Sequence, residues 1–340
     1  MPKSLHWKPA TRFQQNEALN LVSIPRLLRP WLQPDSFDNT PKHDEDEDWS
    51  HMAVPKGQTF ERYVAGKYNK PSRRQNKIYL QPLGSSVDES WPDLNVLAAG
   101  CSAFYGLETI LLPPITLAEL EASGERPIRT RGAPYGGQLQ MHASDVNANL
   151  KAVKPDDAFT LCAVTMIDLF QDSFNFLMGL AAHRSGVGVF SFFRHQPNEP
   201  ECEFFHGSLE RRPGDGDALL RHAYQLVTHE LGHTFGLNHC VYFSCLMQGF
   251  NSLEEAQKRI PDLCPVCLRK LLWCSAAETR AGVVGRYERL HDFYRAHPRS
   301  FGRHYDFVCK RLGRAPEPPE VPPEGVCEAC EGDAEQETGS

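Results

Sequence analysis

The chain has 340 residues, 41% of them hydrophobic, which is enough for one large domain or two small ones with a real core. Its formal net charge of −7 argues against a general nucleic-acid binder, and no apolar run approaches the roughly 18 residues that a membrane helix needs. The N-terminus lacks the apolar core of a signal peptide. We therefore expect a cytoplasmic or nuclear protein whose eleven cysteines bind metal or stay as free thiols, without a disulfide framework.

The two ends of the chain are polar. Residues 1–76 are interrupted by prolines, and we predict an N-terminal extension that the fold does not need. Within it, residues 44–48 are an acidic run typical of a solvated surface, and residues 19–32 are apolar enough for a short helix or a docking strap. Residues 313–340 are rich in proline and glutamate and are predicted to be a disordered acidic tail. The predicted folded domain is therefore 77–312.

Strands and helices alternate from residue 77 onwards, which is typical of a mixed α/β sheet. The expected strands are 78–83, 107–112, 159–165, 174–180 and 187–193, and the expected helices among them are 92–103 and 144–153. The strand at 159–165 is almost continuously apolar, as a central parallel strand would be. Residues 119–142 contain several Gly and Pro residues and are predicted to be loop. Two amphipathic helices, at 282–297 and 301–312, are expected to form a helical C-terminal part.

The most informative stretch is 229–239, which has the pattern His-Glu-x-x-His-x-x-Gly-x-x-His. On a helix, His229 and His233 leave the same face one turn apart, so both imidazoles can bind one zinc ion. Gly236 can end that helix in a left-handed turn that brings His239 back as a third ligand. Three protein ligands with one position left for water are typical of a catalytic zinc site.

An apolar stripe at helical spacing precedes and accompanies these histidines. It consists of Leu219, Leu220, Ala223, Val227 and Leu231. His229 and His233 lie on a neighbouring stripe, and Asp217 is the predicted N-cap after a glycine-rich loop. The pattern therefore predicts a buried, rigid helix as the support of the metal ligands.

Glu230 follows the first histidine directly. It cannot easily reach the same metal, but it can reach a water molecule bound to that metal and act as general base. An accidental match of the whole pattern is expected about 10⁻⁴ times in a chain of this composition, so we prefer a metal site to structural histidines. His183 and His195 have no partner at ligand spacing and are expected to be ordinary surface or core residues.

A group of cysteines follows the histidines. Two pairs, separated by a connecting segment, resemble a Cys₄ zinc site, and they are Cys240 with Cys245 and Cys264 with Cys267. The alternative is four reduced cysteines in the core. A capping-box pattern at 252–255 predicts a short helix between the pairs. Cys327 and Cys330 form a weaker pair in the predicted tail, to which we assign no zinc.

Together these motifs resemble the archaemetzincins, a family of metzincin zinc metalloproteases. The resemblance covers roughly residues 77–312, and it rests on the histidine string running directly into Cys240, Cys245-Leu246-Met247 and then Cys264-x-x-Cys267. It implies a metzincin-like mixed sheet with an active-site helix, a catalytic zinc at the three histidines and a second, structural zinc at the four cysteines. It also implies that Met247 lies beneath the histidines. Without the resemblance, a methionine at this position would be read as an ordinary core residue. No tyrosine follows Met247 closely, so the transition-state tyrosine of some relatives is not assignable here.

The predicted function is a zinc-dependent metallopeptidase with two zinc ions per chain, in which Glu230 is general base to a zinc-activated water. A peptide or protein substrate is expected to pair in extended form with a sheet edge, and 174–182 is the candidate edge. One alternative is a zinc hydrolase of non-peptide amides or esters. Another is a zinc-stabilised binding module with little turnover, against which the intact Glu230 argues. The sequence indicates neither the natural substrate nor the oligomeric state.

Overall fold

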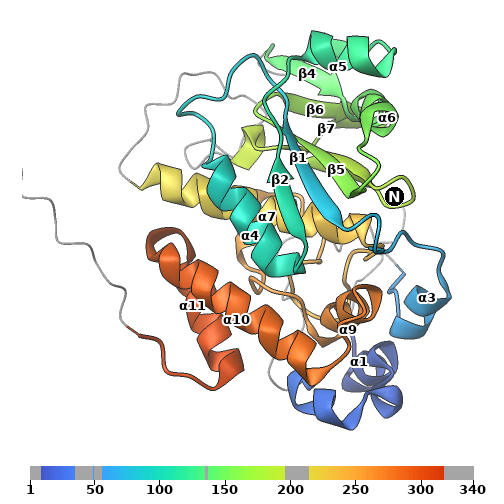
Figure 1. Cartoon of the computed structure of the whole chain (residues 1–340), viewed down its shortest axis with the longest axis vertical. Coiled ribbons are helices and arrows are strands. Elements are labelled where there is room, and N and C mark those ends of the chain that lie inside the picture. The colour runs from blue at the N-terminus through green and yellow to red at the C-terminus, as the bar shows by residue number, and fades with distance from the viewer. Residues whose placement is uncertain (1–8, 35–48, 50–55, 135–136, 196–213, 318–340) are drawn as a thin grey trace, which may run out of the picture.

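The computed structural model describes residues 9–34, 49, 56–134, 137–195 and 214–317 (Figure 1). Its main sheet has five strands in the order β2-β1-β5-β9-β8. The strands are β1 (Lys77–Pro82), β2 (Glu108–Leu111), β5 (Ala158–Thr165), β8 (Gly179–Ala182) and β9 (Val187–Ser191). Four of them run parallel, and β8 at the edge pairs antiparallel with β9. The predicted mixed α/β fold and the central position of β5 are therefore confirmed.

A second, smaller sheet has the order β3-β4-β6-β7. Its strands are β3 (Thr130–Gly132), β4 (Leu139–His142), β6 (Asp168–Gln171) and β7 (Phe174–Leu177). The prediction of loop over 119–142 is wrong, because α5 (Leu117–Gly124), β3 and β4 lie there. Thr116 and Glu119 form a capping box that starts α5, and Leu120 is buried beneath it. The strand predicted at 174–180 is in fact two strands, β7 and β8, in different sheets.

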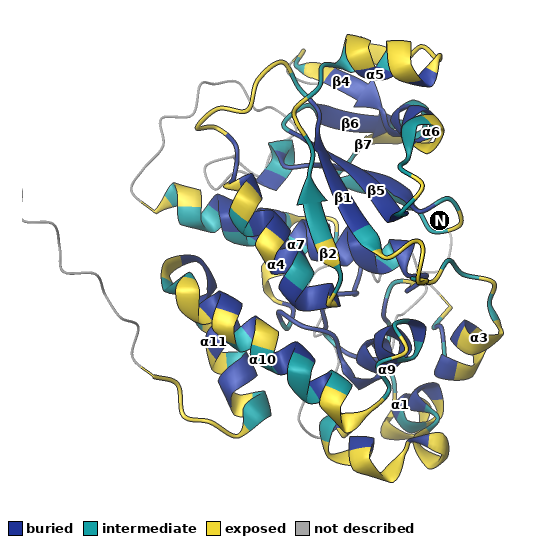
Figure 2. Ribbon diagram, viewed as in Figure 1, coloured by how far each residue is buried: buried dark blue, intermediate teal, exposed yellow. Residues whose placement is uncertain are grey.

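The two faces of the main sheet are covered by different helices. Along β5, Leu161 and Ala163 join the core against α6 (Ala143–Val153), whereas Cys162 and Val164 join the core against α4 (Leu94–Tyr105) and α7 (Asp215–Thr234). This alternation is the period-2 pattern of a strand that is buried on both faces. Figure 2 shows β1 and β5 as buried along most of their length. The long helix α7 therefore lies against the sheet on the side away from α6.

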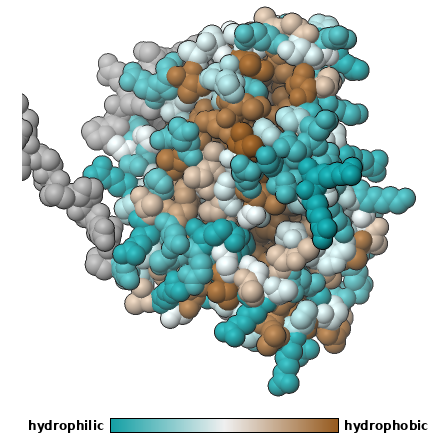
Figure 3. Space-filling model, in the orientation of Figure 1, coloured by the Kyte–Doolittle hydropathy of each residue, from teal (hydrophilic) through white to brown (hydrophobic). Residues whose placement is uncertain are grey.

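The C-terminal helices form a second layer on α4 and α7. They are α8 (Leu253–Gln257), α9 (Pro265–Cys274), α10 (Arg280–Ala296) and α11 (Pro298–Leu312), which confirms the predicted helical C-terminal part. Tyr224 of α7 connects the layers, because its hydroxyl lies 2.8 Å from that of Tyr294 and its ring packs on Phe301. Figure 3 shows hydrophilic residues over the lower helices of this face and apolar residues gathered over its upper centre. Within the described ranges, no helix has the length and apolar composition that crossing a membrane requires.

The described part of the N-terminal region packs against α9. It contains α1 (Arg12–Leu19), the 3₁₀ segments η1 (Leu21–Ser23) and η2 (Arg26–Trp31), and α3 (Phe60–Ala65). Six of its buried side chains join the main core, namely Ala18, Leu19, Ile24, Leu28, Leu32 and Tyr63. The Arg269 guanidinium of α9 donates to the backbone carbonyls of Leu19, Asn20 and Ser23. The docking-strap alternative for residues 19–32 therefore agrees with the structure.

Some predictions concern residues outside the described ranges. They include the acidic run at 44–48, most of the predicted tail, and the pair Cys327 and Cys330. The boundary at residue 76, and the idea that the fold does not need what precedes it, stay predictions. The packing of α1 and η2 against the main core argues against both of these predictions.

Candidate metal centres and active site

Helix α7 supports the first half of the histidine motif. It begins at Asp215 with Gly214 at the N-cap position, so the prediction of Asp217 as N-cap is wrong. The Asp217 carboxylate instead accepts a hydrogen bond of 2.6 Å from the Ser300 hydroxyl at the start of α11. The predicted apolar stripe is buried along α7, and this burial orients His229 and His233 toward the same side of the helix.

The end of α7 turns the chain back on itself at Gly236, as predicted. Gly236 has a φ of +82°, and a Cβ there would overlap the ring of Tyr68. The Gly236 N–H donates to the His233 carbonyl and the Leu237 N–H to the Gly232 carbonyl, which together are a Schellman motif. Only glycine combines this backbone conformation with this close approach. The turn brings His239 to within 4.7 Å of His233, measured between ring centroids.

The histidines meet through their ring nitrogens. The Nδ1 atoms of His229 and His233 each lie 2.6 Å from a backbone carbonyl, that of Leu246 and of Leu237 respectively. Both Nδ1 atoms must therefore carry the proton, which leaves a lone pair on each Nε2. The two Nε2 atoms lie 3.1 Å apart.

This arrangement fits a zinc ion. Two lone pairs that face each other at such a distance repel unless a cation lies between them, and two nitrogens on one tetrahedral zinc would be about 3.3 Å apart. One ring nitrogen from each of His229, His233 and His239 lies within 4.8 Å of the others. Burial lowers the pKa of His233 to about 4 and that of His239 to about 3, so both imidazoles are in the neutral form that binds metals.

Glu230 lies on α7 beside the edge strand β8. Its side chain is 8% exposed, and burial raises its pKa to about 8, an effect that the charge of Arg259 partly opposes. A Cβ on Gly179 would stand 2.7 Å from the Glu230 carboxyl carbon, so the strand passes directly over this carboxylate. The sequence does not predict this contact, because a glycine in a short strand carries no signal of what it faces.

The loop after His239 lies under the histidines. A Cβ on Gly232 would be 2.5 Å from the Met247 sulfur, so Met247 packs against the backbone of α7 beside His233. The carbonyl of Leu246, which accepts from His229, also accepts from the buried Arg259 guanidinium at 2.8 Å. Arg259 donates in addition to the Gln248 carbonyl at 2.7 Å. Arg259 therefore holds the loop on both sides of Met247, a role for which the sequence had no motif.

The four cysteines of the predicted second site also lie together. Their sulfur atoms are within 4.8 Å of one another, and all four are buried. Cys240 Sγ and Cys264 Sγ are 3.7 Å apart, much longer than a disulfide bond but close to the roughly 3.8 Å between two thiolates on one tetrahedral zinc. Hydrogen bonds from the other three thiols, Cys245 first, hold the pKa of Cys240 well below its usual range.

The two candidate metal sites share one loop. Cys240 follows His239 directly, and its N–H donates to the Met247 carbonyl at 2.7 Å. The segment therefore carries the third histidine, two of the cysteines and the carbonyl that orients His229. Neither His183 nor His195 belongs to the histidine cluster, and His195 is buried against Phe250.

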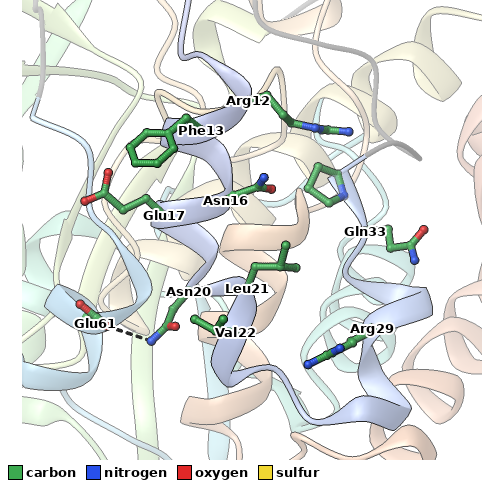
Figure 4. Close-up of a pocket in the computed structure, with 11 residues that line it drawn as sticks. Arg12, Phe13, Asn16, Glu17, Asn20, Leu21, Val22, Arg29, Gln33 and Glu61 are labelled. Atoms are coloured by element: carbon green, nitrogen blue, oxygen red, sulfur yellow. Dashed lines mark hydrogen bonds between the residues drawn. The ribbon is translucent and has the colours of Figure 1, made fainter.

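A separate hollow of about 840 Å³ lies on the N-terminal helices (Figure 4). Phe13 and Val22 are exposed there, and two of the lining residues, Asn20 and Glu61, share a hydrogen bond of 2.9 Å at one edge of the hollow. The metal-ligand clusters are not part of its lining, so it has no part in the chemistry of the histidine site.

Comparisons with known proteins agree with these motifs. The family model described as Peptidase family M54 matches residues 108–272. Archaemetzincin-2 from Homo sapiens is 36% identical over 304 residues, which cover 81% of this chain and 80% of the relative. Archaemetzincin-1 from Homo sapiens is 31% identical over 270 residues, which cover 73% of this chain and 52% of the relative.

Solved structures of archaemetzincins were also matched. The protein from Methanopyrus kandleri is 24% identical with a TM-score of 0.43, over 60% of this chain and 97% of that one. The protein from Archaeoglobus fulgidus is 21% identical with a TM-score of 0.40, over 57% of this chain and 99% of that one. With the sequence identity to the archaemetzincins extending over four-fifths of its length, the chain belongs to the archaemetzincin family of zinc metallopeptidases.

Proposed function

We propose that this chain hydrolyses peptide bonds at a zinc ion held by His229, His233 and His239, with Glu230 as the general base. Family membership supports the reaction class. One observation supports the assignment of these residues most strongly. The Nε2 atoms of His229 and His233 lie 3.1 Å apart with their lone pairs free, and the buried carboxylate of Glu230 is on the next residue of the helix. A structural zinc site would have no need of such a carboxylate.

The residues around the proposed site have distinct tasks. His229, His233 and His239 would hold the zinc ion, which would supply a water molecule with a pKa of about 7 and a Lewis acid for the scissile carbonyl. The Glu230 carboxylate takes the proton from the water and passes it to the leaving amine. Burial raises the pKa of Glu230 to about 8, so its ionised carboxylate is a stronger base than that of an exposed glutamate, and a zinc ion beside it would favour the ionised form. The carbonyls of Leu246 and Leu237 keep the two imidazoles in the metal-binding tautomer.

The substrate is proposed to bind along β8. This strand is the last of the main sheet, so one side of its backbone has no partner strand among the described residues. An extended peptide could add to it as a further strand. Gly179 lies against Glu230, which would bring the scissile bond to the carboxylate. The candidate edge is thereby narrowed from 174–182 to Gly179–Ala182.

The four cysteines are proposed to hold a second, structural zinc ion, which makes two per chain. Four buried thiols fill all positions of a tetrahedral site and leave none for water. This supports a structural role in contrast to the three-ligand histidine site.

Peptide cleavage can be tested before any substrate has been identified. The zinc-loaded protein is incubated with a proteome-derived peptide library, and new N-termini are identified by amine labelling and mass spectrometry. We expect new termini with the wild type and none with His233→Ala, which lacks one ligand. Equal products with both proteins, or hydrolysis of non-peptide amide and ester probes alone, would contradict the proposal.

A further inference from the structure

The turn that carries the third histidine is held by a side chain from the N-terminal region. The Gln58 amide nitrogen donates to the Gly236 carbonyl at 3.0 Å, and the Gln58 amide oxygen accepts from the Asn238 N–H at 3.2 Å. The side chain thus pairs with this turn as a backbone peptide group would. Gln58 is 5% exposed, so these bonds are shielded from water. The residue bonded by its oxygen directly precedes His239.

Gln58 is itself fixed from the cysteine side. The Lys270 ammonium of α9, which is buried, donates to the Gln58 backbone carbonyl and at 3.0 Å to its amide oxygen. Nearby, the Tyr63 hydroxyl donates to the Phe235 carbonyl at 2.7 Å. Hydrogen bonds that involve a charged donor are about twice as strong as neutral ones. Gln58 and Lys270 therefore connect the Gly236 turn to α9, the helix whose N-cap is Cys264.

A second N-terminal residue packs on the imidazole of the third histidine. The Trp49 indole meets the His239 ring edge-on, with 4.7 Å between centroids. It lies over Gly249, where any Cβ would overlap it. The backbone N–H of Trp49 donates at 3.2 Å to the Glu255 carboxylate, and Glu255 is buried. Two contacts thus hold Trp49 against His239: its indole packs on Gly249, and its backbone N–H donates to Glu255.

His239 needs such support more than its two companions. The Nδ1 atoms of His229 and His233 each bond to a carbonyl, whereas no ring hydrogen bond of His239 occurs within the described part of the chain. The orientation of His239 is then set by the backbone turn before it and by the ring packed against it. Gln58 holds the turn, and Trp49 supplies the ring that packs on His239.

We propose that the N-terminal region completes the catalytic centre, with Gln58 and Trp49 as positioning residues for the third zinc ligand. This inference rests on the proposed histidine zinc site. Removing a residue that contacts and orients a metal ligand typically weakens metal binding 10–100-fold. Because Gln58 acts through the backbone, we expect the lower end of that range, about tenfold.

The test measures metal affinity in the full-length protein, with no need of a substrate. Cobalt(II) absorbs differently at thiolate and imidazole ligands, so the two sites are followed separately, and zinc affinity is then measured by competition with a chelator. The variants are Gln58→Ala, Gln58→Glu and Trp49→Ala. Gln58→Glu keeps the acceptor for Asn238 and gives Lys270 a counter-charge, but it loses the donor to Gly236. Gln75→Ala, at an exposed glutamine of the same region, is the matched control.

We expect Gln58→Ala to weaken the histidine site about tenfold, Gln58→Glu and Trp49→Ala to weaken it less, and Gln75→Ala to leave it unchanged. The cysteine site and the melting temperature of Gln58→Glu should stay near wild type. Wild-type affinity in both Gln58→Ala and Trp49→Ala would overturn the inference, and so would equal losses at the two sites in all variants. A wild type that binds zinc but cleaves no peptide would contradict the proposed peptidase function alone.

Discussion

Single hydrogen bonds decide what each residue of the histidine motif can do. Because Nδ1 of His229 is committed to the Leu246 carbonyl, its Nε2 is free for a metal ion. Glu230, the next residue, points to the edge strand at Gly179, where burial raises its pKa. The sequence pattern predicted these two roles from spacing alone, since on a helix adjacent residues point about 100° apart. The Leu246 carbonyl belongs to the loop that follows the motif, and no pattern in the sequence predicts that it orients His229.

Gly236 gives a prediction at this scale. Gly236→Ala must adopt a φ of +82° with a Cβ that overlaps Tyr68, so the free energy of unfolding should fall by more than the roughly 1–2 kcal/mol of left-handed strain. The histidine-site metal should be lost with it, because the turn places His239. Gly313→Ala is the control, since Gly313 has a φ of +69° but no atom within 4 Å of the added Cβ. Denaturant unfolding should separate the two variants, and equal destabilisation would contradict the role of the close contact.

Among the elements, the long periodic ones were predictable and the short ones were not. Helices α4, α6 and α7 and strands β1, β5 and β9 have enough apolar periodicity to appear in the sequence. By contrast, α5, β3 and β4 are brief and lie among Gly and Pro residues that mask them, and β6 was missed altogether. The split of β7 from β8 depends on which sheet each one joins, and such long-range pairing leaves no local signal.

The loop between the two ligand sets gives the next prediction. Cys264→Ser should lower the melting temperature and weaken metal binding at the histidines as well, because Cys240 bonds to Met247 and the same loop carries the Leu246 carbonyl beneath His229. Cys274→Ser, at a cysteine of the same helix outside the cluster, should leave both metals bound. Calorimetry and elemental analysis check this prediction. A Cys264→Ser protein that melts and binds metal as wild type does would contradict it.

Arg259 belongs to the same loop. Arg259→Met should leave the Gln248 carbonyl without its buried Arg259 donor and the Leu246 carbonyl with the His229 bond alone, at a cost of about 1–3 kcal/mol. We expect zinc at the histidine site to bind more weakly, with the cysteine site retained. Arg303→Met is the control, since Arg303 makes an exposed hydrogen bond to the Gln257 carbonyl. Chelator competition measures the effect, and equal affinities in the two variants would rule it out.

At the scale of the whole molecule, the described part of the N-terminal region packs against the helix and the turn that carry the two candidate metal sites. We placed a boundary at residue 76 because the preceding stretch of sequence is polar, and composition cannot reveal contacts such as those of Arg269 with Leu19 or of Lys270 with Gln58. Native limited proteolysis distinguishes the two views. The packing leads us to expect that residues 12–31 and 57–68 stay associated with the body. A stable, metal-binding fragment that begins near residue 77 would instead support the boundary.

Metal content is also a property of the whole chain. We expect about two zinc ions per chain in protein purified without chelator, and about one in His233→Ala with the fold retained. Elemental analysis against protein concentration measures both. A wild type with one zinc at most would exclude the two-site proposal.

We propose Glu230 as the base of a zinc peptidase, and the turnover of Glu230→Gln tests this role most directly. The amide keeps the size of the side chain but cannot accept the proton, so turnover of a cleaved peptide should fall about 10²–10⁴-fold. Zinc content and melting temperature should stay near wild type, because His229, His233 and His239 are unchanged. Hydrolysis at the wild-type rate would contradict the claim. Loss of zinc from the variant would mean that Glu230 holds the site together, and the mechanism would have to be abandoned.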